Sequence, residues 1–512
     1  MLTKVTEIVN RVLSLDGFPK PTALFLSNTI RSGEFSRWND SRYRKQTLLG
    51  ILTADKSTSV AAQPVSEVPK KRSLSIADFR MHAFTISGIR TYGAPASGVY
   101  GLLTSDPQGI PQSGVISGCN GSGKTSIYVA LELLGLHRSP LTEVLSDDPA
   151  LHRKINTHSP ADGDRRPVDS SVIAYTPSGR FSFSYAGQGN NLEQLSVPEA
   201  FYCSEYDVAS LLNNDISLEY LCRQLGIFPI YEFKKFLDFI YSAISLLNEI
   251  ISQYNTPRTS IIPDKNSKHA INGKFLSFRK RYGLPTSLKL ADLTEYPLKD
   301  IEALRNECLT TINLAISEFC VKANRIVRDL VDTFRLPDTP HSVPEFSVTT
   351  IRTGPDSGYR TVTTTARIGS SRFNPRQIYN NFTFRIYCTA VKIAFACTAM
   401  RVHRINFPIV IDDIFDGSDF ENRSHIRNFV DSLAANYART PDAASYPLQI
   451  ILLTQDELVA EGFHDGLRLN NPDDNVWYIR LHRPEDCDAA TDLTEVNLNG
   501  ETVRIMQIGT RC

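Results

Sequence analysis

One segment, GCNGSGKT at 118–125, has the residue types and spacing needed to hold a phosphate group. It matches the pattern GxxxxGK[ST], in which glycines let backbone N–H groups turn inward and the following helix points its positive end at the anion. Lys124 is expected to reach the β- and γ-phosphates of a nucleotide, and the Thr125 hydroxyl is expected to hold Mg²⁺. The predicted nucleotide-binding residues are Gly118, Asn120, Gly121, Ser122, Gly123, Lys124, Thr125 and Ser126.

A second segment, FPIVIDD at 407–413, ends an apolar run with two acids. The run is typical of a buried parallel strand, and ligands bind at the carboxyl ends of such strands. Asp412 is expected to bind Mg²⁺, directly or through water, and Asp413 to orient or deprotonate an attacking water. Together with the phosphate loop upstream, the two acids predict ATP hydrolysis.

The elements around these segments predict an α/β domain that a helical excursion interrupts. A strand-like run precedes the phosphate loop and the helical pattern TSIYVALELLGL follows it, which is the order the loop requires. Further along, apolar residues from Phe233 to Ile251 alternate spacings of four and three, which favours a packed helix or a short coiled coil. A second long helix, from Ile301 to Leu330, is expected to be its antiparallel partner across the polar stretch 255–273.

After this excursion the chain returns to strand and helix patterns, so four stretches are expected. They are an N-terminal helical extension and linker at 1–75, an N-terminal ATPase lobe at 76–216, a helical insertion at 217–344 and a C-terminal ATPase lobe at 345–512.

Bulk composition favours an ordinary globular protein of the cytoplasm. Hydrophobic residues make up 41% of the chain, and Lys+Arg and Asp+Glu both count 55, so the whole chain exerts no net electrostatic pull on nucleic acid. The nine cysteines are scattered, which is typical of reduced thiols and not of a disulfide framework or a zinc site. No apolar run approaches the roughly 20 residues of a membrane span.

The two segments together resemble those of ABC ATPases, and in particular the SMC/RecF branch. GCNGSGKT is similar to the GxNGSGKT of that branch, and DDIFDGSD at 412–419 resembles the Walker B plus D-loop pattern DExxSxLD. The resemblance spans roughly residues 79–470 and implies an ABC/SMC-like P-loop NTPase head that a helical insertion splits. It also implies ATP and Mg²⁺ as cofactors, with two ATP-bound copies facing each other and Asp419 contacting the opposite subunit.

Three departures from the family pattern predict weak or conditional turnover. Asp413 stands where the family has Glu, and Gln455, after the strand IILLT, stands where a γ-phosphate-sensing His is usual. A Gln can hydrogen-bond a phosphate oxygen but carries no charge. No LSGGQ-like signature is evident. NPRQ at 374–377, or Asn380 and Asn381, could offer N–H groups to a partner's γ-phosphate, with plain helix capping as the alternative. Lys124, Asp413 and Gln455 are the predicted catalytic residues.

The remaining candidates are less specific. The Q-loop equivalent is expected near 201–207, and Arg90 and Tyr92 resemble the first-strand segment that lies near the nucleotide base. Two basic runs, at 70–72 and 279–281, are expected to be solvated faces, with the second as the better candidate for a nucleic-acid contact.

In its proportions the chain resembles the stand-alone ATPase subunits of bacterial anti-phage systems. That resemblance implies a sensor or scaffold that oligomerises through ATP and controls a partner effector, such as a nuclease. Two alternatives stay open at this point. One is a RecF/SMC-like DNA-repair ATPase that acts directly on DNA, and the other is a structural oligomer that ATP holds together with little turnover.

Overall fold

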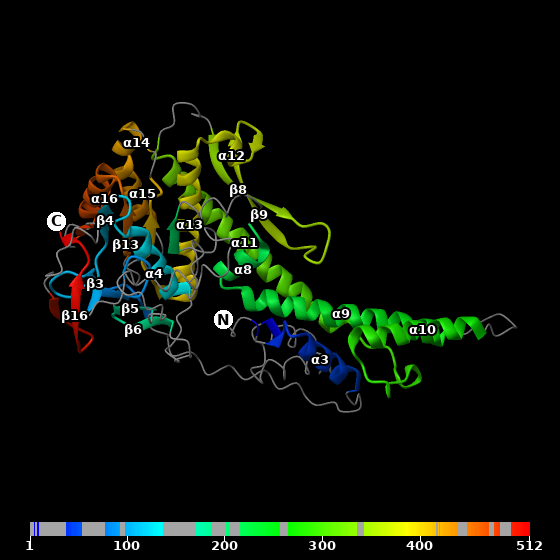
Figure 1. The fold of residues 1–512 in the computed structure, drawn as a ribbon. Helices are drawn as coiled ribbons and strands as arrows, with labels where there is room; N and C mark the ends of the chain where they lie inside the picture. Colours follow the sequence, from blue (N-terminus) through cyan, green and yellow to red (C-terminus); the bar gives the residue numbers. More distant parts are fainter. Residues whose placement is uncertain are drawn as a thin grey trace. The chain divides into compact units, whose positions relative to one another are not determined.

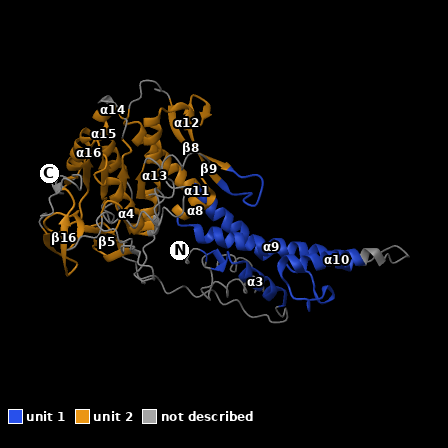
Figure 2. Ribbon diagram, in the orientation of Figure 1, with its two compact units in different colours: residues 1–74, 226–316, 350–360 blue, residues 75–225, 317–349, 361–512 orange. Residues whose placement is uncertain are grey.

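The computed structural model describes residues 5, 8–9, 37–53, 77–92, 98–136, 170–185, 201–204, 216–256, 265–334, 342–415, 418, 420–438, 448–470, 476–481 and 493–511. The chain divides into two compact units (Figures 1 and 2). Unit 1 holds residues 1–74, 226–316 and 350–360, and unit 2 holds residues 75–225, 317–349 and 361–512.

A six-stranded sheet with the order β17-β14-β4-β13-β12-β7 forms the centre of unit 2. All neighbouring pairs are parallel except β14 with β17. The central strands β4, β12 and β13 are buried along their whole length, which explains why the sequence shows apolar runs in β12 and β13 instead of alternation. The strands are β4 (Gly114–Gly118), β7 (Tyr202–Ser204), β12 (Ile409–Asp412), β13 (Ile450–Thr454), β14 (Trp477–Leu481) and β17 (Thr510–Arg511).

A second six-stranded sheet of unit 2 has the order β15-β16-β3-β2-β5-β6 and is antiparallel except between β16 and β3. Its strands are β2 (Ala83–Ser87), β3 (Val99–Leu103), β5 (Ser170–Thr176), β6 (Gly179–Tyr185), β15 (Leu493–Leu498) and β16 (Glu501–Gln507). The other described strands form two small sheets. One pairs β1 (Ala77–Asp78) with β11 (Ile405–Asn406), and the other has the order β10 (Ser371–Phe373), β9 (Arg360–Ile368), β8 (Ser342–Thr350).

Helix α4 (Lys124–Leu136) contacts both six-stranded sheets, touching β12 and β13 of one and β5 and β6 of the other. It is apolar almost all round, and such a helix is stable only when it is buried on every side. The parallel sheet is also covered by α16, which packs on α15. The helices of unit 2 include α8 (Leu218–Gln224), α12 (Pro375–Ile378), α13 (Asn381–His403), α14 (Phe420–Ser424), α15 (Ile426–Ala438) and α16 (Glu457–Asn470).

Helix α13 has the length and composition of a membrane span over Asn381–Arg401, and 89% of that window is buried inside the structure. Its buried side chains include Ile386, Val391 and Phe395. That degree of burial is typical of a core helix.

Unit 1 is mainly helical. Helix α3 packs on α9, where the ring centroids of Trp38 and Phe233 lie 4.8 Å apart. Tyr296 Oη donates a 2.7 Å hydrogen bond to the carbonyl of Leu52. The elements of unit 1 include α3 (Ser41–Thr53), α9 (Phe228–Asn255), α10 (Lys265–Tyr282) and the 3₁₀ helix η3 (Leu290–Asp292). Helix α11 (Lys299–Val331) begins in unit 1 and ends in unit 2.

Helices α10 and α11 both contact α9, and α10 was not predicted. The expected partner α11 contacts it where Arg305 and Asp238 form a 2.7 Å ion pair. Helix α10 begins at Lys265, inside the stretch 255–273 that was expected to be a connection, and it also packs along α9. Helix α10 was missed because its composition is mostly polar and basic. Its apolar periodicity rests on only four buried residues, Ile271, Phe275, Phe278 and Tyr282. The basic run Arg279-Lys280-Arg281 is the last turn of this helix.

These elements confirm the predicted fold class to the extent of an α/β unit with a parallel central sheet and a helical insertion. The parallel sheet carries the phosphate loop, an antiparallel sheet lies on the other side of α4, and the chain leaves this unit after Leu225 and returns to it within α11.

Gly114 provides a test of the central sheet. Its register partner on β14 is Trp477, and a Cβ on residue 114 would lie 2.1 Å from that indole ring. Trp477 has little freedom to move, because its Nε1 donates a 2.9 Å hydrogen bond to the Gln112 carbonyl. We expect Gly114→Ala to cost about 3 kcal/mol or more by overpacking, seen as a melting temperature several degrees lower. The matched control is Gly273→Ala, where an added Cβ meets nothing within 4 Å. Equal melting temperatures for the two variants would contradict this packing.

Candidate nucleotide-binding site

The phosphate loop runs between the end of β4 at Gly118 and the start of α4 at Lys124. Two of its residues, Gly121 and Gly123, have φ angles of 85° and 98°, which L side chains rarely adopt. The Ser122 N–H donates to the Cys119 carbonyl at 3.2 Å, which closes the turn. Gly123 also leaves no space for a side chain, because a Cβ there would lie 2.7 Å from Tyr92 Oη. The two glycines are therefore required by the path of the backbone.

The Lys124 side chain is folded back along this loop. It is 5% exposed, and its Nζ donates hydrogen bonds to the carbonyls of Gly118 at 2.8 Å and Cys119 at 3.3 Å. A buried ammonium needs partners of this kind. The loop thus holds a positive charge on its inner side, next to the N-terminus of a helix that is itself electropositive.

The other residues of the predicted loop set fall into two groups. Asn120 is exposed and Thr125 is partly exposed, so both can reach a ligand. Ser126 is buried, and its Oγ lies 2.9 Å from the Thr91 hydroxyl. The Ser126 side chain therefore ties the first turn of α4 to the turn that follows β2.

The two acids lie at the same edge of the parallel sheet as the phosphate loop. Asp412 is the last residue of β12 and pairs in register with Leu453 of β13, which pairs with Ile116 of β4. Because all three strands run parallel, their carboxyl ends meet at one edge. Asp412 is 6% exposed, and Asp413 has a φ angle of 46°, a left-handed conformation that Asp tolerates better than most residues.

Asp413 and Gln455 are joined directly. The Gln455 N–H, just after the end of β13, donates a 3.0 Å hydrogen bond to Asp413 Oδ1. The next residue, Asp456, accepts from the Leu458 N–H at the start of α16 and forms a 2.5 Å ion pair with Arg423 of α14. This links the segment after β12 to the segment after β13. The Arg423–Asp456 pair was not predicted, and no sequence pattern marks it.

Arg90 lies close enough to Asp412 for their charges to interact. It occupies a tight turn after β2, with a φ angle of 47° and two backbone hydrogen bonds between Ile89 and Tyr92. Burial lowers the pKa of the Arg90 guanidinium, and the Asp412 carboxylate raises that pKa in opposition. The turn also packs on the phosphate loop, as the contact between Tyr92 and Gly123 shows. Arg90 and Tyr92 therefore lie in a turn after β2 and not in the strand itself, and their expected place near a nucleotide base stays a prediction.

The residues expected at a subunit interface are placed as helix caps. Asn374 Oδ1 accepts from the Arg376 N–H at 2.9 Å at the start of α12. Asn380 Oδ1 accepts from the Thr383 N–H at 2.8 Å, and Asn381 opens α13. These residues had two interpretations, helix capping and contact with a partner's γ-phosphate. The Asn374 and Asn380 side chains are used for helix capping.

Three other expectations lie partly or wholly outside the described residues. Asp419 and the basic run 70–72 are outside them, and so is the stretch 205–207 of the expected Q-loop. The preceding strand β7 is described, and its Ser204 pairs in register with Asp412, so it ends at the same edge of the sheet.

No protein-family model matches the chain, and no curated protein matches it. Among solved structures, the SMC head domain of Pyrococcus furiosus bound to the C-terminal domain of ScpA is 12% identical with a TM-score of 0.40, over 79% of this chain and 94% of that one. RecF bound to ATPrS is 10% identical with a TM-score of 0.39, over 79% and 96%. The SMC head domain from Thermotoga maritima is 11% identical with a TM-score of 0.32, over 83% and 98%. Strand order and the phosphate loop, and not these identities, identify the fold.

Proposed function

We propose that the chain binds ATP with Mg²⁺ at this sheet edge and hydrolyses it. The observation that carries the proposal is the register that brings the Lys124 loop and the two acids to one edge of the parallel sheet. Loop N–H groups and the Lys124 ammonium bind the phosphates, while Thr125 and Asp412 are the metal ligands. Asp413 positions the attacking water and accepts its proton, and Mg²⁺ supplies neutralisation of phosphate charge.

The same residues favour slow or conditional turnover. Asp413 Oδ1 already accepts the Gln455 N–H, so one acceptor position of the carboxylate is not available to a water. Gln455 can orient a γ-phosphate by hydrogen bonding but adds no positive charge to the site. A second copy of the chain completes the site and accelerates hydrolysis. The residues that it contributes are Asp419, and Asn380 and Asn381 at the N-terminus of α13.

We expect ATP-dependent self-association, which can be measured by light scattering after size exclusion. With Mg²⁺ and a non-hydrolysable ATP analogue, the mass is expected to rise from the monomer value of 57.2 kDa to twice that or more. With ADP it stays at the monomer value. A mass that does not depend on the nucleotide would contradict the oligomeric part of the proposal, while leaving ATP binding to be judged by calorimetry.

The biological role that fits best is a cytoplasmic sensor or scaffold of anti-phage defence, in which ATP-driven assembly controls a partner effector such as a nuclease. What supports it is the resemblance in proportions together with the features that favour conditional turnover. Affinity purification from the native host, with neighbouring genes intact, tests it. A stoichiometric effector is the expected result, and a preparation that carries DNA but no second protein would instead favour a RecF/SMC-like repair ATPase.

A further inference from the structure

Asp413 is held in place by β13 and by the residue that follows this strand. The Asp413 N–H donates to the Leu453 carbonyl at 3.0 Å, and Asp413 Oδ1 accepts the Gln455 N–H at 3.0 Å. The φ angle of 46° at Asp413 lies in the left-handed region, which persists in an L residue only where the surroundings enforce it. Any group that fixes the Gln455 backbone therefore also fixes the Asp413 carboxylate.

Asp456 fixes Gln455 from the other side, with both of its carboxylate oxygens engaged. The Asp456 N–H donates to Thr454 Oγ1 at 3.2 Å. Its Oδ1 accepts the Leu458 N–H at 3.0 Å, which is the capping contact at the start of α16. Its Oδ2 pairs with Arg423 of α14. The Gln455 backbone is therefore held between the end of β13 and a residue that is bonded to two helices.

Arg423 makes this arrangement depend on α14. The side chains of Arg423 and Asp456 are 32% and 18% exposed, so salt and water screen their ion pair only in part. Helix α14 also contacts α16 directly, and an added Cβ at Gly462 of α16 would lie 4.0 Å from the Arg423 carbonyl. A displacement of α14 therefore changes the contacts of Asp456.

We propose that Arg423 and Asp456 are positioning residues for hydrolysis. Their ion pair keeps the Gln455 N–H on the Asp413 carboxylate, and neither residue touches the phosphates. This role rests on the proposed function, in which Asp413 positions the attacking water. Asp419, which we propose to contact a second copy, directly precedes α14 in the sequence. The ion pair therefore links that contact to the carboxylate that acts in hydrolysis, so turnover depends on assembly.

The ion pair can be removed without loss of the helix cap. Asp456→Asn keeps the contact with the Leu458 N–H, because asparagine is an equally good N-cap residue. We expect the melting temperature to change little, since partly exposed ion pairs contribute little to stability. The single-turnover rate of hydrolysis is expected to fall about tenfold, because small displacements of a catalytic group lower the rate steeply. The affinity for MgATP, measured by calorimetry, is expected to stay within about twofold of the wild-type value.

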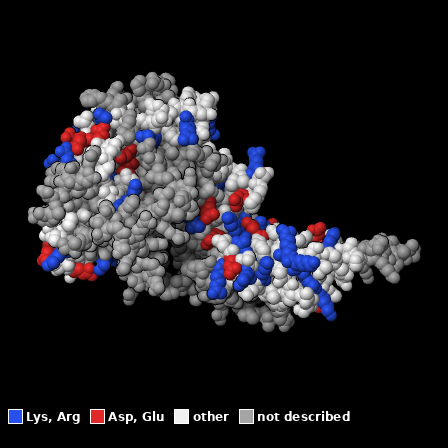
Figure 3. All heavy atoms as spheres, in the orientation of Figure 1, with Lys and Arg blue, Asp and Glu red and all other residues white. Residues whose placement is uncertain are grey.

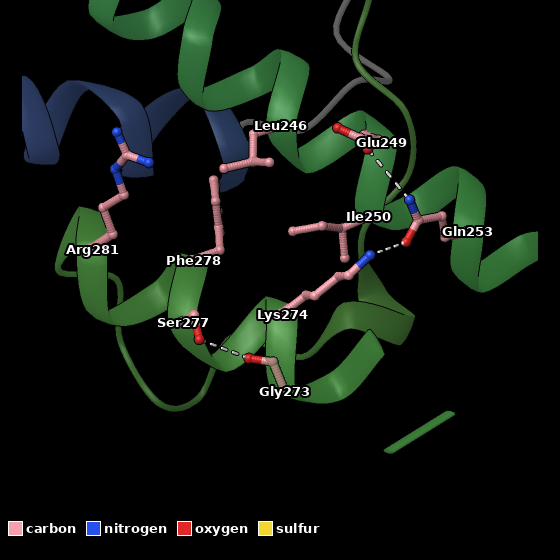
Figure 4. Close-up of a pocket in the computed structure, with 9 residues that line it drawn as sticks. All are labelled: Leu246, Glu249, Ile250, Gln253, Gly273, Lys274, Ser277, Phe278 and Arg281. Atoms are coloured by element: carbon pink, nitrogen blue, oxygen red, sulfur yellow. Dashed lines mark hydrogen bonds between the residues drawn. The ribbon is translucent and has the colours of Figure 1, made fainter. Parts of the chain in front are cut away.

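The cation of the pair is tested in the same way. Arg423→Gln is expected to slow single turnover as much as Asp456→Asn does, and Arg423→Lys, which keeps a cation, to restore most of the rate. Lys274→Gln is the matched control for the loss of one positive charge. It lies on α10 of unit 1, where Lys and Arg side chains gather on the face shown in Figure 3. Figure 4 shows its 2.9 Å hydrogen bond to Gln253 Oε1, and we expect its hydrolysis rate to equal that of wild type.

An Asp413→Asn background separates positioning from a general structural effect. Asparagine cannot take a proton, so Arg423→Gln is expected to change the remaining rate by less than about twofold there. A further loss of about tenfold in that background, an equal loss in Lys274→Gln, or a wild-type rate in Arg423→Gln would overturn the proposal. If only Asp413→Asn slows hydrolysis, the positioning role fails and the proposed function stands. If Asp413→Asn itself hydrolyses ATP at the wild-type rate, the proposed role of Asp413 fails first.

Discussion

Replacing Lys124 by alanine is expected to lower the affinity for MgATP by more than about 100-fold. The ammonium is buried and makes two hydrogen bonds to loop carbonyls, so it is positioned to exchange those partners for phosphate oxygens. Each hydrogen bond between charged groups contributes roughly 1.5–3 kcal/mol, and two such bonds account for a loss of this size. Isothermal titration calorimetry with the wild-type chain and the variant measures it directly.

Cys119→Ala is the matched control for this prediction. It changes the same loop, but the Cys119 side chain is exposed and the contact with Lys124 is made by its carbonyl, which the substitution keeps. We therefore expect wild-type affinity for MgATP. If Lys124→Ala bound MgATP as tightly as Cys119→Ala does, with both variants folded, the assignment of the phosphate site would be wrong.

Asp413→Asn is expected to bind MgATP normally and to hydrolyse it about 100-fold more slowly or worse, which is the usual effect of removing a general base. Asparagine tolerates the left-handed backbone at this position, and its amide oxygen still accepts the Gln455 N–H. The fold is therefore kept while the ability to take a proton is lost. Phosphate release in single-turnover experiments measures the chemical step.

Asp413→Ala should behave in the same way in hydrolysis, and it traps the ATP-bound assembly. It should also melt at a lower temperature, because alanine lacks both the local hydrogen bond and the tolerance for φ of 46°. Unchanged single-turnover hydrolysis in Asp413→Asn would remove Asp413 from the chemistry and move the role of base to another group.

The sequence predicted those parts of the fold in which local pattern and tertiary environment agree. The strands β12 and β13 are apolar runs because both faces of the sheet are covered, and the glycines of the phosphate loop are required by the backbone. Helix α10 was missed because six of its residues are basic and its apolar positions are few. Its partner α9 covers those few positions, which is a tertiary effect that periodicity cannot show.

For the candidate site, spacing along the chain was enough to mark Lys124, Asp412 and Asp413. Residues that only the topology of the sheet brings together could not be predicted from spacing. Arg423 and Asp456 meet because α14 follows β12 and α16 follows β13, and these strands are neighbours in the sheet. Ser126 directly follows the motif, but the structure places its hydroxyl 2.9 Å from that of Thr91, a contact that the motif could not predict.

The most direct test of the central claim is the structure of the chain with Mg²⁺ and a non-hydrolysable ATP analogue. We predict the β- and γ-phosphates inside the loop 118–125, with Lys124 Nζ moved from the Gly118 carbonyl to phosphate oxygens and Mg²⁺ between Thr125 and Asp412. Nucleotide bound elsewhere, or a loop that stays empty at saturating nucleotide with Lys124 still on Gly118, would contradict it.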